Sequence, residues 1–348
     1  MKSMRTPDEL AGAGLIAPDR AAALAQVAAR YAVAVPPALA ALIDRNDPND
    51  PIARQFVPDV AELTTRPEEN ADPIGDAAHT PVEGIVHRYP DRVLFKLTHV
   101  CAVYCRFCFR REMVGPDHPN ALSVQARQRA LAYIAAHPEI WEVILTGGDP
   151  LVASARRLSE TLRALAAIDH VRVLRIHTRV PIAAPETVTP TLVRALQVRA
   201  KPTWVAVHVN HPRELGSEQR AAIARLADAG LPLVSQTVLL KGVNDSVETL
   251  EALMRALVAC RIKPYYLHHA DLAPGTAHLR TDIATGQALM RALRGRVSGL
   301  CQPEYVLDIP GGHGKAPIGP RYVTPAEDAH MTVTDFTGQP HAYPPDDQ

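Results

Sequence analysis

Three of the five cysteines in this 348-residue chain lie within one stretch of eight residues. Cys101, Cys105 and Cys108 have the spacing C-x3-C-x2-C, whereas Cys260 and Cys301 stand alone. An odd number of cysteines with one cluster does not indicate a disulfide framework. Three thiolates on a tight loop can bind three irons of a 4Fe–4S cluster, and the fourth iron then stays open to a small chelating ligand.

A structural zinc ion is the alternative for these cysteines, with His99 or His118 as the fourth ligand. Structural zinc sites usually contain two pairs of ligands, and no second C-x2-C pair follows downstream. The spacing therefore favours the iron–sulfur cluster.

A glycine-rich segment near the C-terminal end, PGGHGK at 310–315, contains a single lysine, Lys315. A phosphate-binding P-loop would need glycine at 309 and serine or threonine at 316, where the chain has Ile309 and Ala316. Two interpretations stay open from the residues alone. Lys315 is a solvated turn lysine, or it forms a Schiff base with pyridoxal phosphate (PLP) in a partly dry site where its amine can lose a proton.

Two further segments could contact ligands. In HRYPDR at 87–92, Arg88 and Arg92 can make forked, charge-assisted contacts to a phosphate, or they can form an Arg–Asp surface network. Gly147 and Gly148 follow an apolar run at 143–145. Two glycines allow the backbone to approach a ligand closely and expose its amide groups, although Gly-Gly turns also follow strands without any ligand.

The elements that must position these motifs alternate along the chain from residue 92 onward. The predicted strands are 93–97, 143–145, 171–176, 204–209, 233–240, 265–268 and 305–309, and the predicted helices are 124–136, 155–167, 191–198, 217–229, 247–260 and 286–297. Strand starts recur about every 30 residues, the length of one βα unit. This repetition favours a complete or partial parallel β/α barrel, with an open doubly wound sheet as the alternative. The loops after the strands form the active-site face of such a barrel, and each motif above lies in one.

The flanking regions differ from this pattern. Residues 1–85 are predicted to form an N-terminal helical extension, with Ala-rich helices at 21–31 and 37–42. Residues 86–319 then form the barrel, and residues 320–348 are polar and Pro-rich, which predicts a C-terminal tail that lies over the surface.

Composition excludes several classes of function. The chain has 37 Lys and Arg against 37 Asp and Glu, so it lacks the positive excess of a general nucleic-acid or membrane-surface binder. No stretch approaches the roughly 20 apolar residues that span a bilayer, and no apolar signal-peptide core follows Lys2 and Arg5. We therefore expect a soluble, cytoplasmic protein with no nucleic-acid or membrane partner.

The cysteine loop, with Phe107 before its third cysteine at the end of a first barrel strand, resembles that of the radical S-adenosylmethionine (SAM) superfamily. The longer run at 101–115, CAVYCRFCFRREMVG, is similar to that of the lysine 2,3-aminomutase family. The resemblance covers roughly residues 45–320, with several motifs in order. It implies a partial β/α barrel of the radical SAM type, whose reduced cluster splits SAM into methionine and a 5′-deoxyadenosyl radical.

The same resemblance implies roles for individual residues. Cys101, Cys105 and Cys108 would bind the 4Fe–4S cluster, and Lys315 would bind PLP. The PLP phosphate would be bound by Arg88, Tyr89 and Arg92, and SAM by Gly147, Gly148, Asp149, His208 and Gln236. Arg110 would bind the substrate carboxylate, and Asp271 and Asp308 the ε-ammonium group of lysine. From the residues alone, His208 could also be a hydrogen-bonded histidine at a strand end, and Asp271 and Asp308 could start a turn or pair with an arginine.

The implied reaction converts L-lysine to β-lysine by moving the amino group from C2 to C3. Two carboxylates in one pocket favour a cationic side chain and would repel glutamate, and the relatives that act on glutamate lack this acidic pair. Another cationic amino acid, such as ornithine or arginine, is the alternative substrate. A non-catalytic iron–sulfur redox sensor is the remote alternative, in which Lys315 would have no task.

The chain also departs from the family pattern. Larger members carry cysteines that form a zinc site between subunits, whereas here Ser246 follows the run GVND and no cysteine follows Cys301, so no structural zinc is expected. His268 and the short length resemble the branch that isomerises lysine for elongation factor P, but GGHGK with Asp308 is closer to the free-lysine branch. The resemblance further implies a homo-oligomer and a one-electron reductant of the flavodoxin or ferredoxin type.

Overall fold

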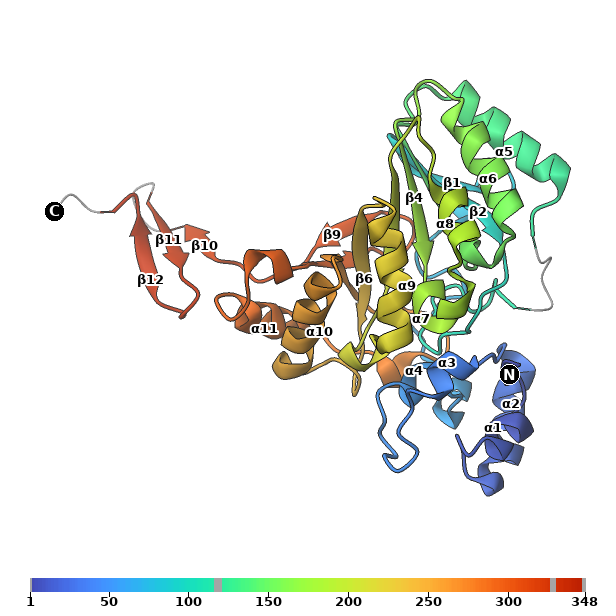
Figure 1. Cartoon of the computed structure of the whole chain (residues 1–348). Coiled ribbons are helices and arrows are strands. Elements are labelled where there is room, and N and C mark those ends of the chain that lie inside the picture. Colours follow the sequence, from blue (N-terminus) through green and yellow to red (C-terminus); the bar gives the residue numbers. More distant parts are fainter. Residues whose placement is uncertain (1, 116–120, 326–329, 346–348) are drawn as a thin grey trace.

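Seven parallel strands form the central sheet of the computed structural model, which describes residues 2–115, 121–325 and 330–345 (Figure 1). They are β2 (Arg92–Thr98), β3 (Glu142–Gly147), β4 (Val173–Thr178), β5 (Thr203–His208), β6 (Leu233–Leu239), β7 (Lys263–His269) and β8 (Glu304–Asp308). Side chains alternate between the two faces of each strand. On β4, for example, Leu174 and Ile176 are buried against helices, while Arg175 and His177 point to the opposite face.

The sheet ends in one antiparallel strand at each edge. β1 (Ile85–Tyr89) pairs with β2, and β9 (Lys315–Pro317) pairs with β8. The strand order runs from β1 to β9, and within the described residues these two edges do not pair with each other. The sheet is therefore a curled, incomplete barrel, which confirms the predicted fold class.

Helices cover the outer face of the sheet, and all six predicted ones are present. They are α5 (Val124–Ala136), α6 (Ala155–Ala166), α8 (Pro190–Leu196), α9 (Ser217–Asp228), α10 (Val247–Ala259) and α11 (Ile283–Leu293). Ser123, Ser154 and Ser246 cap α5, α6 and α10, because each hydroxyl accepts a hydrogen bond from the N–H group of the third helical residue. None of the described helices is both long and apolar enough to cross a bilayer.

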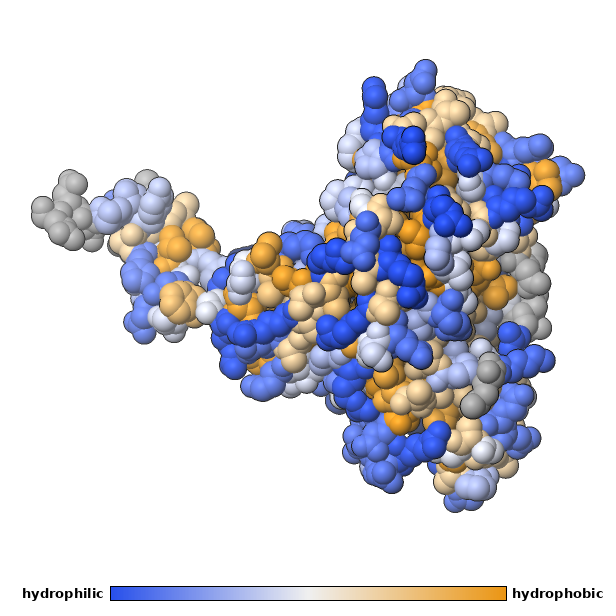
Figure 2. Space-filling model, viewed as in Figure 1, coloured by the Kyte–Doolittle hydropathy of each residue, from blue (hydrophilic) through white to orange (hydrophobic). Residues whose placement is uncertain are grey.

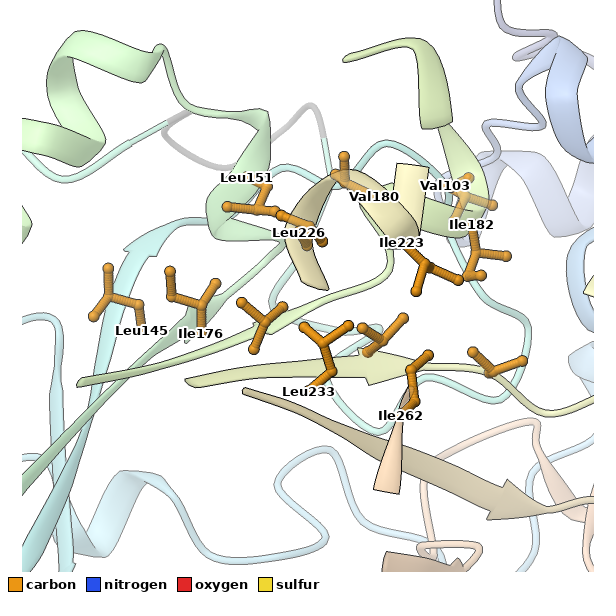
Figure 3. Close-up of a cluster of buried hydrophobic side chains, with 14 of the residues drawn as sticks. Val103, Leu145, Leu151, Ile176, Val180, Ile182, Ile223, Leu226, Leu233 and Ile262 are labelled. Atoms are coloured by element: carbon orange, nitrogen blue, oxygen red, sulfur yellow. The ribbon is translucent and has the colours of Figure 1, made fainter. Parts of the chain in front are cut away.

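The main hydrophobic core lies between this outer face and the helices (Figure 3). Leu145, Ile176 and Leu233 come from the strands, and Ile223 and Leu226 come from α9. Val103, which lies between Cys101 and Cys105, packs into the same hydrophobic core beside Ile182. The loop that carries the cysteines is thus anchored in the core by an apolar side chain.

The N-terminal segment is helical, with α1 (Pro7–Gly12), α2 (Ala21–Arg30), α3 (Pro37–Ala40) and α4 (Ala53–Phe56). Thr6 and Glu9 form a capping box at the start of α1. The segment packs against the loop after β2, since the Tyr104 and Arg106 N–H groups donate to the carbonyls of Ala34 and Gln55. It therefore lies on the same face of the barrel as the cysteines.

The chain ends in a separate three-stranded antiparallel sheet, which we call the C-terminal arm: β10 (Val323–Pro325), β11 (Met331–Thr334) and β12 (Pro340–Tyr343). Figure 1 shows it extending away from the barrel, whereas the sequence predicted a tail lying over the surface. A tight turn explains the difference. The Asp335 carboxylate accepts hydrogen bonds from the Thr337 and Gln339 N–H groups, and Gly338 has a φ of 91°, so β11 and β12 form a hairpin.

Candidate active site

The interior of the partial barrel is a cavity of about 1670 Å³, its open mouth included. In a closed β/α barrel, bulky branched apolar side chains fill such inward positions. Here many of them carry polar or ionisable side chains: Arg175, His177, His208, Gln236, His268, Asp308 and Lys315. The interior is therefore suited to bind polar ligands.

All three clustered cysteines border this cavity, on the loop that follows β2 (the cysteine loop, residues 99–115). Burial raises the pKa of each thiol, to about 12 for Cys105. Iron binding would therefore displace three thiol protons. Three sulfur donors on one loop, facing one cavity, fit a 4Fe–4S cluster with one iron open to a ligand.

The zinc alternative depended on a fourth ligand at His99 or His118, and His118 lies outside the described residues. Within the part of the chain that the structure describes, no group of three His, Cys, Asp or Glu side chains could hold a single metal ion such as zinc. A 4Fe–4S cluster differs because each of the three thiols binds a separate iron.

A buried carboxylate from the N-terminal segment holds the cysteine loop in place. Glu62 is fully buried and pairs with the guanidinium groups of Arg106 and Arg111. Burial tends to raise the carboxyl pKa of Glu62, but the two arginines bring it below its usual value. Arg106 also donates Nη1 to the Ala32 carbonyl at 2.8 Å. The loop conformation is thus set by residues far upstream in the sequence.

Gly147 and Gly148 allow the turn after β3 to press against the cysteine loop. A Cβ atom on Gly148 would lie 2.3 Å from the Val100 carbonyl oxygen, and Gly147 has a φ of 118°. The N–H groups of Gly148 and Asp149 donate to the carbonyls of Thr98 and Val100, so the Gly148 amide group, which the sequence predicted to be exposed to a ligand, is already bonded.

Asp149 borders the cavity, but its carboxylate is occupied within the chain. It accepts hydrogen bonds from the Thr178 hydroxyl at 2.7 Å and from the N–H groups of Leu151, Arg179 and Val180. A carboxylate with four donors has little capacity left for a ligand. Its carboxylate therefore ties the turn after β3 to the end of β4.

Three side chains from neighbouring strands form a neutral polar wall of the cavity: His177 on β4, His208 on β5 and Gln236 on β6. Burial lowers the pKa of His208 to about 3 and that of His177 well below its usual value. The Gln236 Nε2 atom lies 3.4 Å from His177 Nε2. Both imidazoles are therefore neutral near pH 7 and can each donate and accept a hydrogen bond.

Lys315 lies at the seam where the sheet stays open. Its backbone N–H donates to the Tyr89 hydroxyl oxygen at 2.6 Å, which links β9 to β1. Its Nζ donates to Asp308 Oδ1 at 2.7 Å, so it is an ion-paired residue of the cavity wall and not a solvated turn lysine. Gly314 permits this approach, because a Cβ atom there would lie 2.9 Å from the Tyr89 hydroxyl.

Arg88 and Arg92 border the same cavity. Arg88 donates Nη2 to Asp76 Oδ1 at 2.9 Å, and its buried Nε has no partner within the described residues. The Arg92 guanidinium stacks on the Tyr89 ring, 3.7 Å from the centroid, and also pairs with Asp91. Two cations and a hydroxyl thus face one part of the cavity, as a phosphate site requires.

Arg110 is bound by a carboxylate that the sequence did not single out. Its Nε and Nη2 lie 3.2 and 2.9 Å from Asp76 Oδ2, and its Nη1 lies 3.4 Å from the Thr146 hydroxyl. Burial acts to raise the carboxyl pKa of Asp76, but Arg110, Lys96 and Arg88 together bring it below its usual value. Asp76 is therefore ionised and holds Arg110 in one orientation.

Asp271 and Asp308, the two acidic residues singled out for the substrate ammonium group, differ in charge state. Burial, followed by the nearby Asp308 carboxylate, raises the pKa of Asp271 to about 7. Burial also acts on Asp308, but His268 and Lys315 lower its pKa well below the usual value. Asp308 Oδ2 lies 3.7 Å from His268 Nδ1, while Oδ1 holds Lys315. The Asp308 carboxylate is therefore ionised and paired within the chain, whereas the Asp271 carboxyl group is half-ionised near pH 7.

Every residue that the sequence singled out for the cluster, SAM, PLP or the substrate borders this one cavity. Their individual roles stay predictions. The sequence reasoning missed Arg175 and His177, although their alternation with Leu174 and Ile176 on β4 could have placed them inside the barrel. It also missed Asp76, which no local pattern distinguishes from other aspartates.

Comparison with known families identifies the class of protein that this fold and site define. Residues 95–256 match the radical SAM superfamily, so the chain is a radical SAM protein. Residues 290–348 match a second family model, described as lysine-2,3-aminomutase.

The chain belongs to the lysine 2,3-aminomutase family. It is 39% identical over 315 residues to the L-lysine 2,3-aminomutase of Clostridium subterminale, covering 90% of this chain and 75% of that one. It is 41% identical over 306 residues to the enzyme of that name from Acetoanaerobium sticklandii, covering 88% and 73%. A glutamate 2,3-aminomutase from Clostridioides difficile is 34% identical over 314 residues, covering 90% and 74%.

Membership of this family makes the chain an isomerase and implies a 4Fe–4S cluster, SAM and PLP as its cofactors. The residues present fit these groups, because three thiols, an ion-paired lysine amine and two arginines border one cavity. Lysine and glutamate enzymes both occur among the relatives, so the substrate must be argued from the site.

Replacing Glu62 by glutamine tests whether this carboxylate sets the cysteine loop. Glu62→Gln leaves Arg106 and Arg111 as buried cations without their anion. We expect the free energy of unfolding to fall by about 3–5 kcal/mol and the reconstituted protein to retain less iron. Urea denaturation and iron analysis measure the two effects. Glu83→Gln is the control, since Glu83 pairs with Arg129 at the surface and should contribute less than about 1 kcal/mol. Unchanged stability and iron retention in Glu62→Gln would contradict the assignment.

Proposed function

We propose that this chain converts L-lysine to β-lysine by moving the amino group from C2 to C3, in a radical reaction that depends on SAM and PLP. One observation carries the proposal: a single cavity is bordered by the three cysteines, by Lys315 and by the carboxylates Asp271 and Asp308. Two carboxylates on one wall favour a substrate with a cationic side chain. Family membership supports the aminomutase reaction.

The cysteine end of the cavity is proposed to bind the cluster and SAM. When bound, the cluster and SAM supply a 5′-deoxyadenosyl radical, and PLP supplies a relay for the migrating nitrogen. Among the protein groups, His208 and Gln236 offer neutral hydrogen-bonding contacts for SAM. An imidazole with a pKa of about 3 carries no charge near pH 7 and therefore does not repel the sulfonium cation.

Lys315 is proposed to bind PLP, and Arg88, Tyr89 and Arg92 are proposed to bind the PLP phosphate. To act as a nucleophile, the Lys315 amine must lose a proton and leave its contact with Asp308. Asp308 then keeps only the long contact of 3.9 Å to Arg88 Nη1 as a cationic contact, and it can accept a closer one. A substrate ε-ammonium group, held between Asp308 and Asp271, would restore the charge balance.

The charge pattern also orients the substrate. Arg110 is proposed to contact its α-carboxylate, while Asp271 and Asp308 contact its ε-ammonium group. A glutamate side chain would bring a third carboxylate to Asp271 and Asp308, which disfavours glutamate. Ornithine and arginine are cationic too, so they are the alternative substrates. Two destinations for the product stay open: the free β-lysine pool and attachment to elongation factor P. The mass of elongation factor P, compared between cells with the intact chain and cells with Lys315→Ala, distinguishes them, because only attachment makes that mass depend on Lys315.

An anaerobic assay tests the proposal directly. Reconstituted protein with PLP, SAM, dithionite and L-lysine should accumulate β-lysine, resolved by chromatography against the standard. Lys315→Ala and Cys105→Ala should each abolish it, because one removes the single lysine amine among the described residues that border the cavity and the other removes a proposed cluster ligand. Cleavage of SAM with lysine untouched would refute the substrate assignment, and ornithine and arginine would then be assayed.

The acidic pair generates a pH dependence. Asp271 has a pKa of about 7, so it is mostly ionised above pH 7 and increasingly neutral below. A neutral carboxyl group attracts the ε-ammonium group less, and the KM for lysine should therefore rise as the pH falls, by up to about tenfold from pH 8 to pH 6. Asp271→Asn should show a high KM that no longer changes over this range. A flat profile in the unaltered protein would rule out this role for Asp271.

We also propose that the chain forms a homo-oligomer through the C-terminal arm. The three-stranded sheet of the arm exposes Val323, Met331, Phe336 and Tyr343. Figure 2 shows apolar surface on the arm. A second copy of the chain would cover these side chains. Light scattering on the intact protein should give a mass above that of one chain, and Phe336→Ser with Met331→Ser should reduce it. A monomer at all concentrations would refute this contact.

The remaining partners follow from the chemistry. The cluster needs one electron per activation, so we propose a flavodoxin- or ferredoxin-type protein as the donor that replaces dithionite in the cell. Three reduced thiols as cluster ligands support a cytoplasmic location. The balance of 37 basic and 37 acidic residues supports the absence of nucleic-acid and membrane partners. Turnover with a purified flavodoxin or ferredoxin in place of dithionite tests the proposed electron donor.

A further inference from the structure

We propose that Asp76 is a positioning residue that couples the phosphate-binding end of the cavity to the site of the substrate carboxylate. This inference rests on the function proposed above and explains how the chain aligns its two anion-binding arginines, Arg88 and Arg110. Both arginines border the cavity, whereas Asp76 lies behind its wall and is 1% exposed. It would act through the arginines and not through contact with a ligand.

The two carboxylate oxygens of Asp76 are divided between the two arginines. Oδ1 accepts from Arg88 Nη2 at 2.9 Å, and Oδ2 accepts from Arg110 Nη2 at 2.9 Å and Nε at 3.2 Å. Arg88 also donates to the Ile74 carbonyl at 2.7 Å. These contacts leave Arg88 Nη1 and Arg110 Nη1 with only long contacts, of 3.9 Å to Asp308 and 3.4 Å to Thr146. Each arginine therefore keeps a donor for an anionic ligand.

The backbone around Asp76 is itself fixed against the loop that carries Lys315. The Asp76 N–H donates to Asp72 Oδ1 at 2.8 Å. Gly75 packs so closely on Gly312 that a Cβ atom would lie 2.4 Å from the Gly312 nitrogen. His79 Nε2 lies 3.0 Å from the Gly312 carbonyl oxygen. The carboxylate thus has a set position relative to the PLP lysine as well as to both arginines.

The local charge balance suits two anions. Asp76 pairs with both Arg88 and Arg110, and the half-buried Lys96 is a further cation that acts on it. The Asp308 carboxylate also lies near Arg88, but it is paired with Lys315, so the three cations Arg88, Arg110 and Lys96 still outnumber the single carboxylate of Asp76. A phosphate and a carboxylate can neutralise this positive surplus. Without Asp76, the two guanidinium groups would repel each other and lose their common anchor. Both ligands should then bind more weakly.

The variant Asp76→Asn tests this coupling because asparagine has nearly the same shape but one acceptor oxygen. Its NH₂ group would face one of the two arginines. We expect the Kd for PLP, measured by the absorbance of the bound cofactor, and the KM for lysine both to rise by about tenfold or more. We expect a smaller change in kcat, since Asp76 does not border the cavity. In an Arg110→Lys background, Asp76→Asn should still raise the Kd for PLP but should change the KM for lysine much less.

Asp50→Asn is the matched control. Asp50 is also fully buried and pairs with an arginine, Arg213, at 2.7 Å, but neither residue borders the cavity. It should lower stability and leave the Kd for PLP and the KM for lysine unchanged. If Asp76→Asn does not fold, Asp76→Glu replaces it, because displacing the carboxylate by one methylene should raise both constants severalfold.

The outcomes separate this inference from the proposed function. An active protein in which Asp76→Asn changes neither the Kd for PLP nor the KM, or changes only one of them, would overturn the coupling role. If the unaltered protein makes no β-lysine, the proposed function fails, and the PLP titration still decides whether Asp76 positions Arg88.

Discussion

Two buried carboxylates from the N-terminal segment, Glu62 and Asp76, hold the groups on which the whole site depends. Each is shared by two arginines: Arg106 and Arg111 for Glu62, and Arg88 and Arg110 for Asp76. Three of these arginines belong to the cysteine loop. Because an unpaired buried charge costs several kcal/mol, each shared pairing strongly disfavours other arrangements of the loop. The helical extension is thus part of the site and not only a cover.

The open seam of the sheet is the second constraint. Because β1 and β9 do not pair, the barrel interior need not be filled by side chains, and ionisable residues can line it beside a cavity. The seam is bridged by side chain and loop contacts instead, through the Tyr89 hydroxyl and the close packing of Gly75 on Gly312. The lysine that is proposed to bind PLP therefore lies where the barrel is open and yet is held firmly.

The cavity wall carries charges of both signs close together, since Arg88 Nη1 lies 3.9 Å from Asp308 Oδ1 and Lys315 pairs with the same carboxylate. Arg88, Arg92 and Arg110 contribute positive charge, Asp271 and Asp308 contribute negative charge, and the buried histidines between the strands are neutral. An amino acid with a carboxylate at one end and an ammonium group at the other matches such a wall. In this arrangement the same carboxylate, Asp308, holds Lys315 before the cofactor binds and can hold the substrate afterwards.

The sequence by itself determined the seven parallel strands and the six helices that cover them, and it predicted the main site residues, but it did not predict the edge strands β1 and β9 or the three strands of the C-terminal arm. The predicted elements and residues depend on local features: period-two and period-3.6 patterns, the spacing of Cys101, Cys105 and Cys108, and the glycine-rich run before Lys315. Tertiary structure alone decided that the amide groups after β3 are already bonded, that Asp149 is saturated and that Asp76 joins Arg88 to Arg110. The physical reason is that a charge or a hydrogen-bonding group does not specify its partner. Segments far apart in the sequence must first be brought together by packing of the core, and only then is it fixed which groups pair and which stay available for a ligand.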